Sequence, residues 1–293
     1  MQNWDGIFRF DWSNKRKTTL HKEPIQDFSI AQDAVSLLAE RIINLMYLRG
    51  DVKTAETAVA WPYGPSYWKR LKPHDRPSTI EVPDNFTKLG FYCRIGVLRE
   101  DLSMPGIMKL NSHEAFLKEL TPAERKAIAG PVFVCQTNQI SYDAKGGTFK
   151  VVTLKLESLT VEQGDMTGRV LTVKDADSFQ VVTAAALDGE DLRHSGRIIL
   201  FHQSNVSNKY MRFTSNDMCT VEDWGRNAQL IRRARAKLEL SLAGKAYKVS
   251  AVGLNGRTKA VVPAVVDGGR LSFNADTSFF GGTMVYLIEK AVR

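Results

Sequence analysis

The 293-residue sequence lacks the patterns that mark several large classes of protein. No run of about 18 apolar residues is present, so we expect no membrane-spanning helix. A basic segment followed by an apolar core, which is the pattern of a secretory signal, is missing from the N-terminus. The cysteines are only three, Cys93, Cys135 and Cys219, and no CxxC pair occurs. We therefore expect buried structural thiols rather than disulfides or a metal site.

Motifs of metal, nucleophilic and phosphate chemistry are missing as well. The five histidines do not have metal-ligand spacing, and no HExxH or GxSxG motif occurs. Gly281-Gly282 has neither the lysine nor the following helix of a phosphate-binding loop. The sequence thus predicts no metal, no cofactor and no catalytic residue of these kinds.

Charge of one sign is in modest excess. Lysine and arginine number 40 against 32 acidic residues, a net charge of +8 with a pI near 9.3. The charges are dispersed, and the densest runs are Asn14–Lys17 and Arg232–Lys237. A nucleic-acid partner is not expected, whereas a basic β-sandwich that binds an anionic polymer is one interpretation to test by salt dependence.

Apolar periodicity predicts one long helix near the N-terminus. Between Ile30 and Leu48 apolar residues recur at helical spacing. Ser29 is the expected N-cap, with Gln32 completing a capping box, and Gly50 is the expected stop. Before it, Gly6–Trp12 alternates like a strand.

The middle of the chain is mixed in character. Prolines and aromatic residues alternate from Trp61 to Pro83, which predicts irregular structure that packs on a surface. Leu89–Leu98 reads as a buried strand, and Ser112–Ile128 as helical with a Thr121-Pro122 helix start.

After Gly130 the sequence predicts only β-structure. Short strand-like runs follow one another, with turn signals at residues 144–147, Asn255-Gly256 and residues 267–269. The fold class expected is mainly β, an antiparallel β-sandwich preceded by a short α/β segment. The expected parts are a βα unit over residues 1–52, a connecting segment over 53–130 and the sandwich over 131–293.

Two stretches resemble a known family. The first stretch is residues 2–13, QNWDGIFRFDWS, followed by Arg49-Gly50-Asp51-Val52. It resembles the last barrel strand and helix of cellulase-like (β/α)8 glycoside hydrolases, in which the usual sequence is close to LQDWDGIYRFAWS and then FRRGDV. Asn3 stands where the family has Asp, and Asp11 where it has Ala. Residues 139–151, QISYDAKGGTFKV, resemble the segment WD-x-x-x-G-x-F-x-V-x-T of the β-sandwich that closes these proteins. Shorter matches follow in the same order at residues 187–189, 198–202, 223–225, 254–257 and 283–286.

The resemblance implies what the chain does. It is expected to be the C-terminal region of a polysaccharide-degrading glycoside hydrolase, with residues 1–52 as the last βα unit of a TIM barrel. The two catalytic carboxylates of that family come from barrel strands four and seven, so this chain alone is not expected to hydrolyse a glycoside. The expected partners are an oligo- or polysaccharide and, for a split gene, a separately encoded barrel fragment. Full-length relatives are expected to be secreted or periplasmic.

Trp12 with Asp11 and Ser13 is the first candidate site for carbohydrate. Trp12 falls at the C-terminal end of the barrel-like strand, where an indole ring could stack on a sugar; the other interpretation is that it belongs to a core. Asp5 and Asp11 are six residues apart on an extended segment, about 20 Å, which is too far for a glycosidase pair.

Trp61 and Trp68 form a second candidate sugar platform. Their alternative role is to seal the joint between the barrel-like part and the sandwich. For the whole chain, the alternative function is a non-catalytic carbohydrate-binding or scaffold module.

Overall fold

The computed structural model describes residues 2, 13, 23–25, 29–65, 82, 84–110, 116–216, 218–244 and 246–291. Within them the chain forms two compact units, each with its own hydrophobic core. The first unit contains Gln2 and the described residues of Val52–Thr148, and the second contains those of Ile7–Asp51 and Phe149–Arg293. This division differs from the expected one, because the N-terminal helix belongs to the second unit, together with most of the strands predicted for the sandwich.

The first unit is built on a small parallel sheet. Strand β1 (Ala58–Tyr63) lies between β2 (Arg94–Arg99) and β3 (Met108–Lys109), and both pairings are parallel. Helix α4 (Asp84–Leu89) precedes β2, and the short α5 (Phe116–Glu119) and α6 (Pro122–Ala129) follow β3. Strands β4 (Val132–Val134) and β5 (Ile140–Asp143) then form an antiparallel pair.

The core of the first unit explains two departures from expectation. Trp61 belongs to β1 rather than to irregular chain, and its ring lies 5.2 Å from that of Phe86. The predicted strand Leu89–Leu98 is instead the end of α4, a turn and β2, because Leu89 and Cys93 bury their side chains from the helix end and the turn. The apolar run therefore combines the core residues of two elements.

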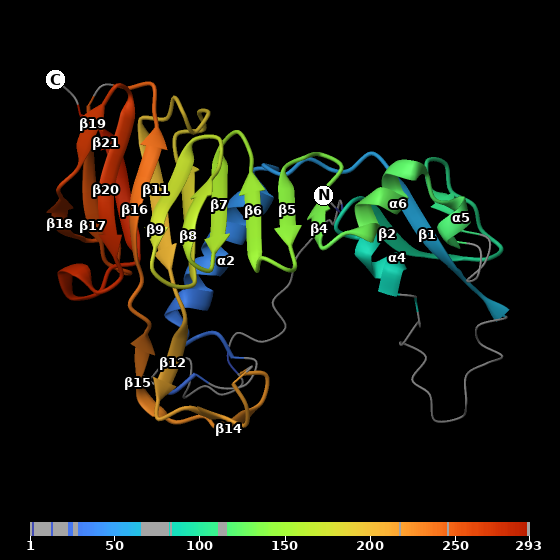
Figure 1. The fold of residues 1–293 in the computed structure, drawn as a ribbon, viewed down its shortest axis with the longest axis horizontal. Helices are drawn as coiled ribbons and strands as arrows, with labels where there is room; N and C mark the ends of the chain where they lie inside the picture. The colour runs from blue at the N-terminus through green and yellow to red at the C-terminus, as the bar shows by residue number, and fades with distance from the viewer. Residues whose placement is uncertain are drawn as a thin grey trace. The chain divides into compact units, whose positions relative to one another are not determined.

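The second unit contains two antiparallel sheets (Figure 1). Within this unit the strands of the larger sheet follow the order β18-β17-β21-β11-β10-β7-β6, and those of the smaller the order β19-β20-β16-β9-β8. The strands of the larger sheet are β6 (Thr148–Val152), β7 (Leu156–Val161), β10 (Gln180–Ala186), β11 (Arg197–Gln203), β17 (Tyr247–Val252), β18 (Thr258–Val262) and β21 (Val285–Lys290). Those of the smaller are β8 (Gly164–Thr167), β9 (Leu171–Ala176), β16 (Arg235–Ser241), β19 (Val265–Asp267) and β20 (Arg270–Asp276).

Facing side chains of the two sheets share one core. Leu159, Val182 and Leu200 of the larger sheet belong to the same buried cluster as Val173 and Leu238 of the smaller. The mainly β class with antiparallel sheets is thus confirmed, and the pairing of faces is compatible with the expected β-sandwich. We call these two sheets the sandwich.

Turn residues in the sandwich follow the sequence signals. Gly256, between β17 and β18, has φ of 76°, and Gly268 and Gly269, between β19 and β20, have φ of 54° and 81°. These left-handed conformations are easily adopted only by glycine, so both turn predictions are confirmed.

A long excursion connects β11 to β16 and hence the larger sheet to the smaller. Within it β12 (Val206–Lys209) pairs with β15 (Arg226–Ile231), and β13 (Arg212–Phe213) pairs with β14 (Val221–Asp223). Figure 1 shows it extending beyond one end of the sandwich. We call the described residues of 206–231 the ribbon. At Gly225 (φ 69°) an added Cβ would lie 2.4 Å from the carbonyl oxygen of Lys209, so the ribbon needs glycine there.

Helix α2 (Ala34–Leu48) packs on the second unit through Leu38 and Ile42. Gln203 of β11 donates a hydrogen bond of 2.8 Å to the carbonyl oxygen of Val35. At the other end the guanidinium of Arg49 pairs with Asp51 and donates to the carbonyl oxygen of Ala186. The expected cap at Ser29 and Gln32 is wrong, since Asp33 caps the helix, whereas Gly50 (φ 61°) follows its end as expected. None of the described helices is long and apolar enough to cross a membrane.

Candidate functional site

The second unit contains a groove of about 740 Å³. One wall is α2, the floor is the outer face of the larger sheet, and the opposite wall is the ribbon. A volume of this size is within the range of small-molecule sites. We call it the α2 groove.

Strand register places a row of four side chains across the floor of the α2 groove. Phe149 of β6 is the register partner of Thr160 of β7, which pairs with Val181 of β10, which pairs with Gln203 of β11. All four line the groove. Because alternate residues of a strand point to opposite faces, Leu159 and Val182, their neighbours in sequence, point into the sandwich core instead.

The lining is apolar over most of its area. Helix α2 contributes Ile42 and Ile43, and Phe149 comes from β6. Phe179 is the residue before β10, and the ribbon contributes side chains that include Met211, Phe213 and Leu230. Ile43 and Leu230 are 39% and 51% exposed, which is high for side chains of this kind. Apolar surface left in contact with water in a concave site favours a ligand that covers it.

Hydrogen-bonding groups are placed among these apolar side chains. Thr160, Asn205 and Ser207 line the groove, and their side chains have no hydrogen-bond partner among the described residues. Ser158 and Thr183, a cross-strand pair, bond to each other at 2.7 Å. The groove therefore offers both a surface for stacking and uncommitted hydroxyl and amide groups.

No acid, histidine or cysteine is among the described residues that line the α2 groove, and its single ionisable side chain is Arg232. General acid–base and nucleophilic chemistry need such groups within hydrogen-bond reach of the substrate. The described lining thus supplies apolar side chains, hydroxyl and amide groups and one guanidinium. Similarly, the described residues contain no group of three or more metal-ligating side chains.

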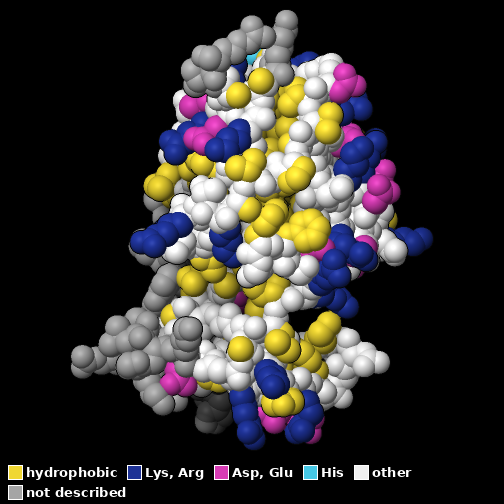
Figure 2. Space-filling view, turned by 90° about the vertical axis from the view of Figure 1, so that its left-hand side faces the viewer, with side chains coloured by type: hydrophobic (Ala, Val, Ile, Leu, Met, Phe, Trp, Pro, Cys, Tyr) yellow, Lys and Arg dark blue, Asp and Glu magenta, His cyan; other side chains and the backbone are white. Residues whose placement is uncertain are grey.

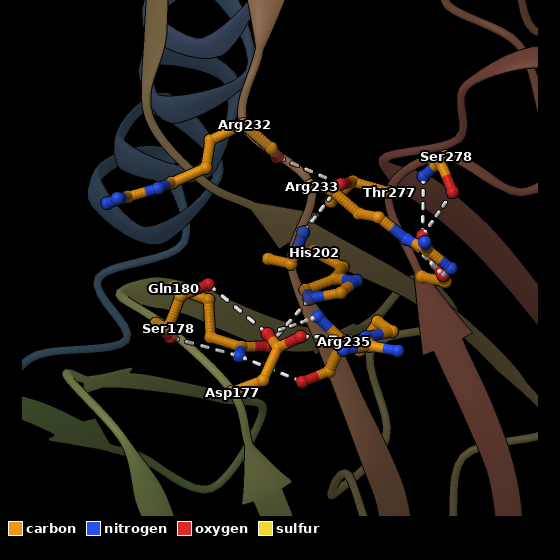
Figure 3. A network of polar contacts seen from close by, with 11 residues as sticks. Asp177, Ser178, Gln180, His202, Arg232, Arg233, Arg235, Thr277 and Ser278 are labelled. Carbon is orange, nitrogen blue, oxygen red and sulfur yellow. Dashed lines mark hydrogen bonds and ion pairs between the residues drawn. The ribbon is translucent and has the colours of Figure 1, made fainter.

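Behind the groove a polar network joins the two sheets at one end of the sandwich (Figure 3). His202 of β11 is fully buried, and its Nε2 lies 2.7 Å from Oε1 of Gln180. Burial lowers the pKa of His202 to about 4, against the opposite influence of the Asp276 and Asp177 charges. The histidine is thus a neutral structural group and not a proton carrier near pH 7.

Asp276 is the most strongly bound acid of this network. Burial alone would raise its pKa, but hydrogen bonds from Arg233 and from Ser278 outweigh burial and lower the pKa to about 2. In the neighbouring turn Asp177 accepts from the side chain of Arg235 at 2.7 Å, and its pKa is lowered for the same balance of reasons. Asp276 and Asp177 thus have a structural role, and each is paired with its own arginine.

Glu157 is a second buried acid that could have been a catalytic candidate, because burial raises its pKa. Its carboxylate accepts hydrogen bonds from the backbone N–H groups of Val170 and Leu171 at 2.9 Å. An added Cβ on Gly168 would lie 2.3 Å from one carboxylate oxygen, which shows how closely the backbone surrounds it. Glu157 does not line the α2 groove, and its contacts are those of a structural group.

The sequence-predicted site residues are only partly within the described structure. Asp11, Trp12 and Trp68 lie outside the described residues. Ser13 is therefore the one residue of the first candidate site that the structure describes. Trp61 is 4% exposed in the core of the first unit, so its ring offers no face on which a sugar could stack. Trp61 is a core residue in this structure, and the described structure brings none of the five predicted residues together.

Among the cysteines, the prediction of buried thiols is confirmed for Cys93 and Cys135 and wrong for Cys219, which is exposed. Burial raises the pKa of Cys93 to about 12, so its thiol stays protonated and unreactive near pH 7.

The residues of the α2 groove were not found by sequence reasoning. Phe149 and Val181 lie in strands that the sequence predicts, over Thr148–Leu156 and Phe179–Ala186, whereas Thr160 of β7 lies in no predicted strand. Their meeting depends on which strands pair and in which register. The available signal was the outward-facing apolar residues of these strands, at positions where a solvated sheet would be polar.

Comparison of the chain with protein-family models, with curated proteins and with solved structures finds no match.

Proposed function

We propose that the chain is a carbohydrate-binding, non-hydrolytic C-terminal region of a polysaccharide-degrading glycoside hydrolase. Its α2 groove is the binding site, and its N-terminal residues correspond to the last βα unit of a TIM barrel. The sequence resemblance motivates the glycosidase origin, since its motifs occur in family order along most of the chain. The catalytic carboxylates of the family belong to barrel strands that are not among the matched segments.

The observation that carries the binding role is the composition of the groove. Sugars present apolar C–H faces and many hydroxyl groups, and proteins bind them with aromatic rings and a few hydrogen-bonding side chains. The row that contains Phe149 and Thr160 places both kinds of group side by side on a rigid sheet. Because the described lining has no acid, the groove supports binding without bond cleavage.

A non-catalytic binding or scaffold module that never belonged to a barrel is the alternative function. It uses the same groove and differs only in the origin of residues 1–52. The genomic sequence upstream of the Met1 codon distinguishes the two, since an in-frame or adjacent barrel supports the glycosidase origin and an unrelated gene favours the free-standing module.

The binding role is tested by titrating the full chain with soluble polysaccharides, including xylan, β-glucan and oligogalacturonides, in a calorimeter. We expect Phe149→Ala and Thr160→Val each to weaken binding about five- to tenfold, through loss of a stacking face and of one hydrogen bond. Phe91→Ala is the matched control, because Phe91 is a comparably exposed ring in the other unit, 42% against 36% for Phe149.

The same protein should release no reducing sugar from these polymers. Absence of binding to every polymer, or equal losses in Phe91→Ala and Phe149→Ala, would contradict the assignment of the groove. Turnover that persists after repurification and is lost on replacing Asp5 or Asp11 would contradict the non-hydrolytic assignment.

A further inference from the structure

We infer that the α2 groove selects carbohydrates that carry a carboxylate, that is, uronic acid units, and that Arg232 is the residue that recognises the acid group. This inference rests on the proposed function of the groove as a carbohydrate site. It adds the chemical class of the ligand, a sugar with a carboxylate, and the side chain that selects this class, Arg232.

Arg232 belongs to a run of three arginines of which the other two are neutralised. Arg233 donates from Nε and Nη2 to Asp276, at 3.0 and 2.6 Å, and Arg235 donates from Nε to Asp177 at 2.7 Å. Arg232 has no carboxylate partner among the described residues. Figure 3 shows its side chain directed toward α2, away from Arg233 and Arg235.

The backbone beneath Arg232 is held from both sides. Its carbonyl oxygen accepts hydrogen bonds from the hydroxyl of Ser204 at 2.5 Å and from that of Thr277 at 3.0 Å. Its N–H donates to the carbonyl oxygen of Asn205 at 2.8 Å. A charged side chain on a fixed base loses less conformational freedom on binding than one on a flexible loop, which favours recognition at this point.

The electrostatic surroundings leave the positive charge of Arg232 uncompensated within the groove. No aspartate, glutamate or histidine is among the described lining residues, and the other polar groups there are hydroxyls and amides. A guanidinium presents two parallel N–H donors that match the two oxygens of a carboxylate. The Arg232 side chain is exposed, so a carboxylate in the groove can reach it, and Ile231 and Val206 line the groove beside it.

A general attraction of the whole surface for polyanions would be a different explanation. Figure 2 shows one face of the molecule, on which basic and acidic side chains are interspersed without a single basic field. Selection by one arginine predicts a preference for one carboxylate per binding site and a modest salt dependence. Non-specific attraction of a polyanion would instead give a steep decrease of affinity with salt concentration.

The test compares three ligands that differ only in the acid group, using the full chain in a calorimeter at low salt. They are an oligogalacturonide, its methyl ester and its carboxyl-reduced galactose counterpart. We expect the free acid to bind about tenfold more tightly than the other two. In Arg232→Gln the three affinities should converge on that of the neutral sugar, and Arg232→Lys should keep part of the preference.

Arg257→Gln is the matched control, since it also removes one positive charge, from an exposed turn of the same unit that does not line the groove. It should leave the preference intact. Equal affinity of the wild-type chain for acid and neutral sugars, or loss of the preference in Arg257→Gln, would overturn the inference while leaving the proposed function in place. A sulfated neutral oligosaccharide that binds as well as the free acid would also overturn it, because recognition would then be of anions in general. Absence of binding to all ligands would instead count against the proposed function itself.

Discussion

At the scale of single residues, His202 is a side chain whose protonation is changed by its place in the fold. The amide nitrogen of Gln180 donates to the carbonyl oxygens of Ser178 and Arg235, which leaves Oε1 of Gln180 as an acceptor for His202. The proton of the neutral imidazole is therefore assigned to Nε2. Nδ1 is buried with no hydrogen-bond partner among the described residues, so a second proton there would be poorly accommodated.

We predict that His202 makes folding of the second unit sensitive to acid. The pKa of His202 is about 4 in the folded chain, below its usual value of 6.5, so the unfolded chain takes up a proton first as the pH falls. Stability is therefore complete above pH 6.5 and decreases between pH 6.5 and 4, by about 2 kcal/mol from pH 7 to pH 5. Urea unfolding followed at several pH values measures this dependence.

The variant His202→Gln should flatten the dependence of stability on pH in this interval, even if it lowers stability at pH 7. His194→Gln is the control, because its side chain is exposed and the variant retains His202. A pH profile of His202→Gln that parallels the wild type would show that other groups cause the acid sensitivity. The Asp276–Arg233 pair is separable from this effect, since the pKa of Asp276, lowered to about 2, affects stability only below pH 4.

At the scale of secondary-structure elements, the start of α2 shows how a capping prediction can be displaced by a few residues. The sequence predicts Ser29 as the cap, whereas in the structure the carboxylate of Asp33 accepts from the N–H groups of Val35 and Ser36 at 2.9 Å. By contrast, the helix start at Thr121-Pro122 is confirmed, with a reciprocal capping box between Thr121 and Glu124. Pro122 marks this start in the sequence, because its fixed φ and missing N–H suit the first helical turn.

We predict that Asp33→Ala destabilises the second unit by about 1 kcal/mol, because two backbone N–H groups lose their acceptor. The melting temperature of that unit should decrease by roughly 2–4 °C. Asp33→Asn is the control, since asparagine caps helices nearly as well as aspartate. Equal losses in the two variants would mean that the charge of Asp33, and not its capping hydrogen bonds, stabilises α2.

Most elements of the sandwich could be predicted from the sequence, whereas strands without an apolar pattern could not. The apolar runs Phe179–Ala186 and Tyr247–Leu254 are predicted as strands, and the structure has β10 and β17 there. Strand β7 (Leu156–Val161) falls outside the predicted strands although it is largely buried. Strand β15 (Arg226–Ile231) has mostly exposed residues. In its partner β12, the side chain of Asn208 accepts a hydrogen bond from the N–H of Ile25 and donates one to the Ile25 carbonyl oxygen. Such pairing is decided by contacts distant in sequence, which local patterns do not contain.

At the scale of the whole molecule, the sequence predicted a mainly β fold but not its division or its groove. The segment expected to end at residue 52 contributes α2 to the same unit as the sandwich, because Leu38 and Ile42 are apolar and bury there. The α2 groove combines this helix with residues more than 100 positions away, such as Phe149 and Gln203. Only the three-dimensional register brings them together, so the candidate platform at Trp61 was chosen from local aromatic content and lies in a core.

We predict that the two units unfold in two separate transitions, because their cores share no residue. Leu89, fully buried in the first unit, and Leu200, fully buried in the second, provide matched probes. Leu89→Ala and Leu200→Ala should each lower the stability of one unit by roughly 2–5 kcal/mol. Differential scanning calorimetry should show each variant shifting a different transition and leaving the other in place.

A single transition that moves by a similar amount in both variants would contradict separate unfolding, since it would mean that the two cores form one cooperative structure. The same experiment assigns the acid-sensitive transition, because only the one that Leu200→Ala shifts should follow the titration of His202.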